Sequence, residues 1–324
     1  MRAVTLGEIM LRLTPPGVKR LAQTAEFEVC YGGAEANVAY ALSQFGAESK
    51  FVSKVPENGL GDAALNSLRA GGVDTHFVLR GGERLGVYYL ERGNAFRAGN
   101  VLYDRAGSAF ACAHPEEFDW DKIFESADWF HFTGITPALS INAEEITRAA
   151  LWAAKKYKIT VSCDLNYRAK LWDTGRARQV LSSLLKQVDV CIANKHQVAE
   201  LFGASEEDAA KYLMGNYAFS HVALSARRTL SATRNVVGGS LYAGEAYVSS
   251  REYELEMAER VGGGDAFAAG IIYALANNYS LQRAIDLAVA CCCMKHTIPG
   301  DYCQFSLQEV ELLAEGQSFC GVKR

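Results

Sequence analysis

The strongest constraint on the fold is a regular alternation of short apolar runs with helical patterns along the chain. The apolar runs have the length and the residue types of buried strands and cover residues 3–6, 51–55, 129–132, 160–164, 188–192 and 222–224. Amphipathic stretches separate them, at 34–45, 62–70, 143–156, 176–185 and 206–214. Strands that alternate with helices form parallel sheets covered on both faces. We therefore expect an α/β fold with a mostly parallel central sheet.

Two segments depart from this alternation. Residues 27–31 and 75–105 contain short runs broken by turn residues, with no helical pattern between them. They predict a small antiparallel sheet apart from the main one, although a simple edge hairpin would give the same pattern. Side chains two positions apart on a strand share a face, so Tyr103 and Arg105 could point into one cleft.

Composition excludes several classes of protein. Of 324 residues, 49% are hydrophobic and 22% are charged, which is typical of a globular enzyme and not of a disordered chain. The formal charge is −4 and no basic block is present, so we expect no nucleic-acid partner and no membrane partner. No apolar run has transmembrane length, and the first residues are typical of a strand and not of a signal peptide.

Cysteine and histidine do not suggest a metal site. The nine cysteines include no Cys-x-x-Cys pair, and Cys291, Cys292 and Cys293 are adjacent in an apolar helical stretch where they would point to different faces. The six histidines show no metal-binding spacing. We expect no direct protein ligands to a metal, and a reducing cytoplasmic location.

The run Gly262-Gly263-Gly264-Asp265 is the most informative motif for function. It is followed by an almost wholly apolar helical stretch. A glycine turn that begins a helix exposes backbone N–H groups and the positive end of the helix dipole, which together attract an anion. Asp265 could be a helix cap or a catalytic base beside a phosphate. Three glycines before a buried helix favour the phosphate site.

These glycines resemble the C-terminal signature of the ribokinase-like sugar kinases, the PfkB family. A second match lies at 31–39, which resembles that family's Gly-Gly-x-x-x-Asn-x-Ala signature. The resemblance implies one domain over 1–324, a ribokinase-like three-layer sandwich, with lid strands from about 12–31 and 75–106. It also implies that Asp265 is the base beside an anion hole, and that Gly32, Gly33 and Asn37 line the sugar site.

Further matches concern the substrate. Residues 164–172 resemble the Asp-x-Asn-x-Arg-x-x-Leu-Trp stretch of family members that phosphorylate 2-keto-3-deoxygluconate, and 86–91, 101–105 and 295–301 also resemble segments of those kinases. A sugar acid requires a cation, and Arg168 is our choice, either for the carboxylate or shared with the transferring phosphate. The resemblance implies further substrate contacts from Tyr89, Tyr103, Arg105 and Asp301.

The expected nucleotide site departs from the family pattern. Asn194 resembles the start of an Asn-x-x-Glu motif, but Gln197 stands at the Glu position. Residues 225–230 take the place of a Thr-x-Gly-x-x-Gly phosphate loop and lack its glycines, while Glu259 replaces the usual Asp and Gly263 the usual Ala. The residues expected near the nucleotide are Asn166, Arg168, Asn194, Ser225, Arg227, Gly262 and Gly264.

The implied activity is an ATP-dependent kinase acting at O6 of 2-keto-3-deoxygluconate, with Mg²⁺ held through ATP and water, and we expect a homo-oligomer. Fructokinase-like or 2-keto-3-deoxygalactonate kinases are alternatives. A non-catalytic sugar sensor is a weaker one, because it should lose the base. A dinucleotide-dependent dehydrogenase would need Gly-x-Gly-x-x-Gly after the first strand, where only Gly7 stands.

Overall fold

The computed structural model describes residues 1–317. Within them the large sheet has ten strands in the order β13-β12-β11-β10-β9-β8-β1-β4-β5, with β14 paired to β12. Its strands are β1 (Arg2–Leu6), β4 (Glu48–Val55), β5 (Val78–Arg80), β8 (Trp129–Thr133), β9 (Thr160–Asp164), β10 (Val190–Asn194), β11 (His221–Thr229), β12 (Arg234–Ala243), β13 (Ala246–Ser249) and β14 (Tyr253–Glu256). Every pair from β11 to β5 is parallel, and the pairs made by β12 are antiparallel.

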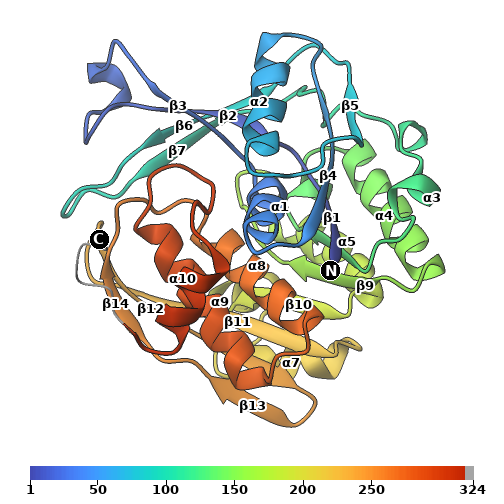
Figure 1. The fold of residues 1–324 in the computed structure, drawn as a ribbon, viewed down its shortest axis with the longest axis vertical. Coiled ribbons are helices and arrows are strands. Elements are labelled where there is room, and N and C mark those ends of the chain that lie inside the picture. The colour runs from blue at the N-terminus through green and yellow to red at the C-terminus, as the bar shows by residue number, and fades with distance from the viewer. Residues whose placement is uncertain (318–324) are drawn as a thin grey trace.

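Helices cover both faces of this sheet. They are α1 (Ala34–Gln44), α2 (Gly59–Arg69), α3 (Trp120–Ile123), α4 (Ile141–Lys156), α5 (Thr174–Leu184), α6 (Lys195–Phe202), α7 (Ala209–Asn216), α8 (Gly263–Ala276), α9 (Leu281–His296) and α10 (Leu307–Ala314). In Figure 1, α1, α8, α9 and α10 lie in front of the sheet, and α4 and α5 lie on its far side. The predicted three-layer arrangement is confirmed.

Two large clusters of buried apolar side chains lie on opposite faces of the large sheet, and the alternation of side chains along the central strands explains them. On β10, Val190 and Ile192 pack with α1, α8 and α9, whereas Cys191 and Ala193 pack with α4, α5, α6 and α7. Successive side chains of a strand point to opposite faces, so a strand buried on both faces is apolar throughout. This is why the predicted strands appear in the sequence as continuous apolar runs.

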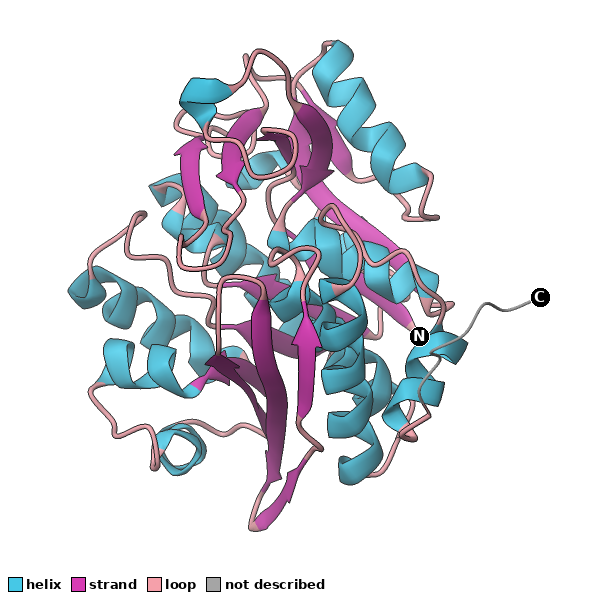
Figure 2. Cartoon of the chain, turned by 90° about the vertical axis from the view of Figure 1, so that its left-hand side faces the viewer, coloured by secondary structure: helices cyan, strands magenta, loops and turns pink. Residues whose placement is uncertain are grey.

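The small sheet lies apart from the large one, as Figure 2 shows. Its order is β3-β2-β6-β7, formed by β2 (Met10–Thr14), β3 (Glu28–Gly32), β6 (Gly86–Glu91) and β7 (Asn100–Asp104). The β2–β3 and β6–β7 pairs are antiparallel and the β2–β6 pair is parallel. We call this small sheet the lid.

Two details of the lid differ from the predicted boundaries. The lid begins at Met10 and not near residue 12, and β5, which falls inside the predicted segment 75–106, pairs with β4 at the edge of the large sheet. A short apolar run does not show which of two sheets it joins, because that depends on long-range pairing. No helix of residues 1–317 is long and apolar enough to cross a membrane.

Candidate active site

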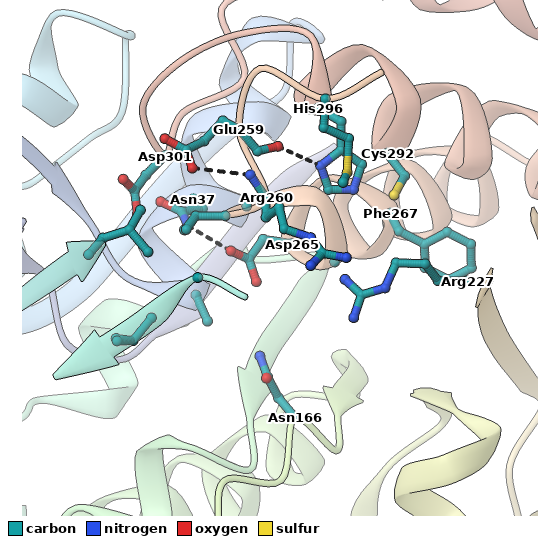
Figure 3. Close-up of a pocket in the computed structure, with 18 of the residues that line it drawn as sticks. Asn37, Asn166, Arg227, Glu259, Arg260, Asp265, Phe267, Cys292, His296 and Asp301 are labelled. Carbon is teal, nitrogen blue, oxygen red and sulfur yellow. Dashed lines mark hydrogen bonds between the residues drawn. The ribbon is translucent and has the colours of Figure 1, made fainter. Parts of the chain in front are cut away.

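A cavity of about 1350 Å³ lies between the lid and the carboxyl ends of the parallel strands. Lid residues, the ends of β9, β10 and β11, and the start of α8 all line it, and Figure 3 shows part of this lining. In open α/β sheets, ligands bind outside the carboxyl ends of the strands. The cavity therefore occupies the position where a substrate site is expected.

The glycine run forms the start of α8. Gly262 is its N-cap with φ +82°, and Gly263 is the first helical residue. The N–H of Ala266 donates to the Gly262 carbonyl at 2.9 Å, so the N–H groups of Gly263, Gly264 and Asp265 have no acceptor within the helix. The positive φ explains glycine at position 262, since other residues rarely adopt this conformation. Gly262 and Gly264 line the cavity, whereas Gly263 does not.

Gly263 faces His296 at the end of α9. A Cβ at position 263 would lie 2.5 Å from the imidazole ring of His296. That ring is fixed by a 2.8 Å hydrogen bond from Nδ1 to the Glu259 carbonyl, and burial lowers the pKa of His296 to about 4, so the ring is neutral. The histidine therefore fills the space that an alanine side chain would need.

Asp265 is half-buried in the first turn of α8 and faces the cavity. The Nδ2 group of Asn37 donates a hydrogen bond to its Oδ2 at 2.6 Å (Figure 3). Burial raises the pKa of Asp265 to about 6, and the charges of Glu35 and Asp301 act in the same direction, while the Asn37 bond and the charge of Arg168 oppose it. A carboxylate with this pKa is ionised at neutral pH and can still accept a proton.

A second carboxyl group faces the same space. Asp164, at the end of β9, is buried, and burial together with the charge of Asp265 raises its pKa to about 7. The N–H of Asn166 donates to Asp164 at 3.0 Å. Arg168 follows on the same loop, is exposed, and lines the cavity. Within residues 1–317 it has no carboxylate at ion-pair distance, although its charge acts on both carboxyl groups.

The lid presents Tyr88 and Tyr103 to the cavity. They are register partners on β6 and β7, and their ring centroids are 6.0 Å apart. Tyr89 does not line the cavity; it lies on the other face of β6 against Phe27. Tyr89, the residue predicted for the substrate, is therefore turned away from the cavity, and its neighbour Tyr88 lines the cavity instead. The sequence shows two adjacent tyrosines, and only the pairing of β6 with β7 distinguishes them.

Arg105 also reaches the cavity, but it is paired. Its Nε donates to Glu8 at 2.7 Å, its Nη2 bonds to the same carboxylate oxygen, and both side chains are buried. The guanidinium is thus fixed in position and its charge is largely balanced by Glu8. Sequence reasoning did not find Glu8, because nothing local marks it as the partner of a residue in the lid.

Asp301 is held by the protein through both oxygens. Nη1 of Arg12 donates to one at 2.8 Å and the hydroxyl of Tyr88 bonds to the other. Arg12, fully buried on β2, also pairs with Glu259. Gly32 packs against Asp301 outside the cavity lining, while Gly33 and Asn37 line it. Asp301 therefore comes to the site as predicted, with its carboxylate already bonded.

The far side of the cavity contains the residues predicted for the nucleotide. Asn194 caps α6 by accepting from the Gln197 N–H at 2.8 Å, and the Gln197 side chain accepts from the Asn194 N–H. Ser225 is the register partner of Asn194, and both line the cavity with Asn166 and Arg227. Among the described residues, no group of three His, Cys, Asp or Glu side chains could hold a metal ion.

Comparison with known proteins identifies the family. The model of the pfkB family carbohydrate kinases matches residues 2–303. The chain belongs to this family. It is therefore a carbohydrate kinase, a phosphotransferase with an alcohol acceptor, and the resemblance carried by the two glycine signatures is confirmed.

Individual relatives cover almost the whole of this kinase. A crystal structure of 2-dehydro-3-deoxygluconokinase from Thermotoga maritima is 44% identical, with a TM-score of 0.96 over 98% of this chain and 100% of that chain. A 2-dehydro-3-deoxygalactonokinase from Haloferax volcanii is 35% identical over 97% of this chain and 96% of its own. A pfkB family carbohydrate kinase from Listeria grayi is 33% identical, with a TM-score of 0.94 over 97% and 100%.

Proposed function

We propose that this kinase transfers the γ-phosphoryl group of ATP to O6 of a 2-keto-3-deoxy sugar acid, either the gluconate or its galactonate epimer. The observation that carries the proposal is the start of α8, where the carboxylate of Asp265 lies at the cavity together with the N–H groups of Gly264 and Asp265, which have no acceptor within the helix. The names of the Thermotoga and Haloferax relatives support the class of substrate.

Asp265 acts as the base. Its Oδ2 is fixed by Asn37, which leaves Oδ1 to accept the proton of the substrate hydroxyl. Because burial raises its pKa to about 6, the rate should rise with pH through about 6 and then level off. The N–H groups of Gly264 and Asp265 stabilise the charge on the transferring group, as donors fixed before the reaction do. Mg²⁺, held by the nucleotide phosphates and water, would offset further negative charge.

Arg168 is the cation proposed for the carboxylate of the sugar acid. Of the two arginines predicted to contact the substrate, Arg105 is neutralised by Glu8, whereas Arg168 is exposed and unpaired within the described chain. An unpaired guanidinium can bind a carboxylate through two parallel bonds without first losing another partner. Arg105, fixed by Glu8, is suited to a hydroxyl or keto oxygen.

A panel of acceptors tests the proposal. Phosphorylation should be measured with 2-keto-3-deoxygluconate, 2-keto-3-deoxygalactonate, fructose and ribose, with ATP in excess. Both acids should be phosphorylated far more efficiently than the neutral sugars, and the ratio between the acids assigns the epimer. Both acids belong in the panel because one relative is named as a kinase of the gluconate and another as a kinase of the galactonate. A preference for fructose would overturn the sugar-acid proposal and favour a fructokinase-like activity.

Assembly and location complete the proposal. Within residues 1–317 the outer strands of the lid, β3 and β7, each pair with one strand only, and Val29 on β3 is 58% exposed and Leu102 on β7 49% exposed. Open strand edges tend to pair, so we propose a homo-oligomer acting in the cytoplasm. Light scattering of the purified protein would give its mass, and a monomer at micromolar concentration would contradict the assembly.

A further inference from the structure

Arg260, two residues before Gly262, has no carboxylate at ion-pair distance within residues 1–317. Its Nη2 lies 3.4 Å from Thr229 Oγ1 and 3.3 Å from Asn235 Oδ1, both of them neutral groups. Its Nε is buried with no hydrogen-bond partner within residues 1–317, and the residue lines the cavity. A buried donor without an acceptor is costly, so a ligand oxygen is the natural partner.

Arg227 faces Arg260 across this part of the cavity. It is exposed on β11, and Figure 3 shows the two guanidinium groups extending toward each other. The two charges interact unfavourably: burial, and then the charge of Arg227, lower the pKa of Arg260. His296, which lies nearby, is neutral and does not offset them. In the part of the chain that the structure describes, neither arginine has an acidic partner, so the two converging cations form a site for an anion.

Neighbouring acids are bonded elsewhere. The Glu259 side chain accepts from Arg12 through Oε2, and its Oε1 accepts from the backbone N–H of Arg260 and not from the guanidinium. Asp301 is bonded by Arg12 and Tyr88. Asp265 is bonded by Asn37 on its other side, away from the arginine pair in Figure 3. The positive charge of the pair is therefore available to a ligand.

The position of the pair indicates which anion it binds. Arg260 is anchored to β11 and β12, whereas the residues proposed for the sugar lie on the lid side, around Asn37 and Tyr103. A polyphosphate with its last group at the start of α8 would extend away from the lid along these strands. Arg227 lies near the end of β11, within the segment 225–230 that takes the place of the glycine-rich phosphate loop and lacks its glycines.

We propose that Arg260 and Arg227 together bind the non-transferred phosphates of the nucleotide, in place of the N–H groups of a glycine-rich loop. This inference rests on the proposed function, because it requires a nucleotide donor. The arginine side chains offer charge-assisted bonds to phosphate oxygens, and a pair of them can contact two adjacent groups.

Equilibrium binding of ATP, ADP, AMP and adenosine tests the inference. For the wild type, affinity should rise with each added phosphate. Arg260→Gln and Arg227→Gln should each lower the affinity for ADP and ATP by about 10- to 100-fold, the usual effect of losing a bond to a charged group. The affinity for adenosine should not change. Arg260→Lys should retain part of the affinity for ADP and ATP that Arg260→Gln loses. The matched control is Arg228→Gln, because Arg228 is adjacent to Arg227, equally exposed, and outside the cavity lining.

The outcomes separate this inference from the function on which it rests. Equal affinity of both glutamine variants and the wild type for ADP would overturn the arginine site while leaving ATP as the donor. An equal loss for adenosine, or a raised KM for the sugar at unchanged nucleotide affinity, would also overturn it. A wild type that binds no nucleotide of the series would reject the kinase proposal itself.

Discussion

Asn37 and Asp265 are joined by a hydrogen bond of 2.6 Å, although 228 positions separate them in the chain. The bond connects the first part of α1 to the first turn of α8, two helices that pack on the same face of the sheet. It brings the two glycine signatures into one site. The orientation of the proposed base therefore depends on the part of the chain that also lines the sugar side of the cavity.

Asp265→Asn should preserve the fold and lower kcat by roughly 10²–10⁴-fold, the usual range for a lost general base. Asparagine retains the size of the side chain and can still accept a hydrogen bond from Asn37. Steady-state kinetics and nucleotide binding by the same variant check this. Turnover within a few-fold of wild type, in a folded variant, would remove Asp265 from the mechanism.

The same variant should be more stable than the wild type at neutral pH. The pKa of Asp265 is raised from 3.8 to about 6 in the folded protein, so folding is opposed as the pH rises from about 4 to above 6. Asparagine removes this opposition, which is worth about 1–3 kcal/mol at pH 8. Urea unfolding at pH 8 and near pH 4 should show a gain that shrinks at the lower pH. A gain independent of pH would contradict the assignment.

Arg168→Lys tests the carboxylate contact. It retains the charge and loses the planar two-bond geometry, so kcat/KM for the sugar acid should fall by about 10- to 100-fold. The rate with a neutral sugar, however low, should change much less. If Arg168 acts only on the transferring phosphate, rates for acidic and neutral acceptors will fall by the same factor.

Arg105→Ala should raise the KM for the sugar and leave the affinity for ATP unchanged. Arg105 lies on the lid side of the cavity and is fixed by Glu8. Glu8→Gln is the companion variant, since it retains the shape of the partner and removes its charge. Glu8→Gln should raise the KM for the sugar less than Arg105→Ala does. Equal losses for sugar and nucleotide would indicate general damage to the fold.

Gly263→Ala should reduce both stability and kcat, because the new Cβ would lie 2.5 Å from the His296 ring. Combining it with His296→Ala, which vacates that space, should recover part of both losses. Thermal unfolding and kinetics of the two single variants and the double variant give the coupling between the positions. Strictly additive losses would show that the ring does not determine the need for glycine.

The parallel strands and the start of α8 could be predicted from the sequence because their signals are local. A strand buried on both faces is a continuous apolar run, and Gly262–Gly264 precede an apolar helix whatever lies around them. The strands β12, β13 and β14 were not predicted, since Gly238 and Gly239 interrupt the apolar pattern of β12. Their pairing with β11 depends on partners distant in the chain.

The site residues that the sequence did not reveal depend on contacts with residues far away in the chain. Tyr88 and Tyr89 are equivalent until β6 pairs with β7, and the pairing places Tyr88 in the cavity. Glu8 lies 97 positions from Arg105, and Arg12 lies 289 positions from Asp301. Arg260 appears in the sequence as one more surface cation. Only the folded chain shows that its Nε is buried without an acceptor.

Arg12 determines how this lid can move. It joins β2 to Glu259 just before the glycine turn and to Asp301 just after α9, and it is fully buried. Swinging the whole lid away would expose two carboxylates and break both ion pairs at once. We therefore expect β2 to stay in place when the lid opens, together with Tyr88 on the adjacent β6, whose hydroxyl also bonds to Asp301. Movement of the edge strand β7 would in turn break the 2.8 Å bond from Lys170 Nζ to the Val101 carbonyl, which ties this edge to the loop after β9.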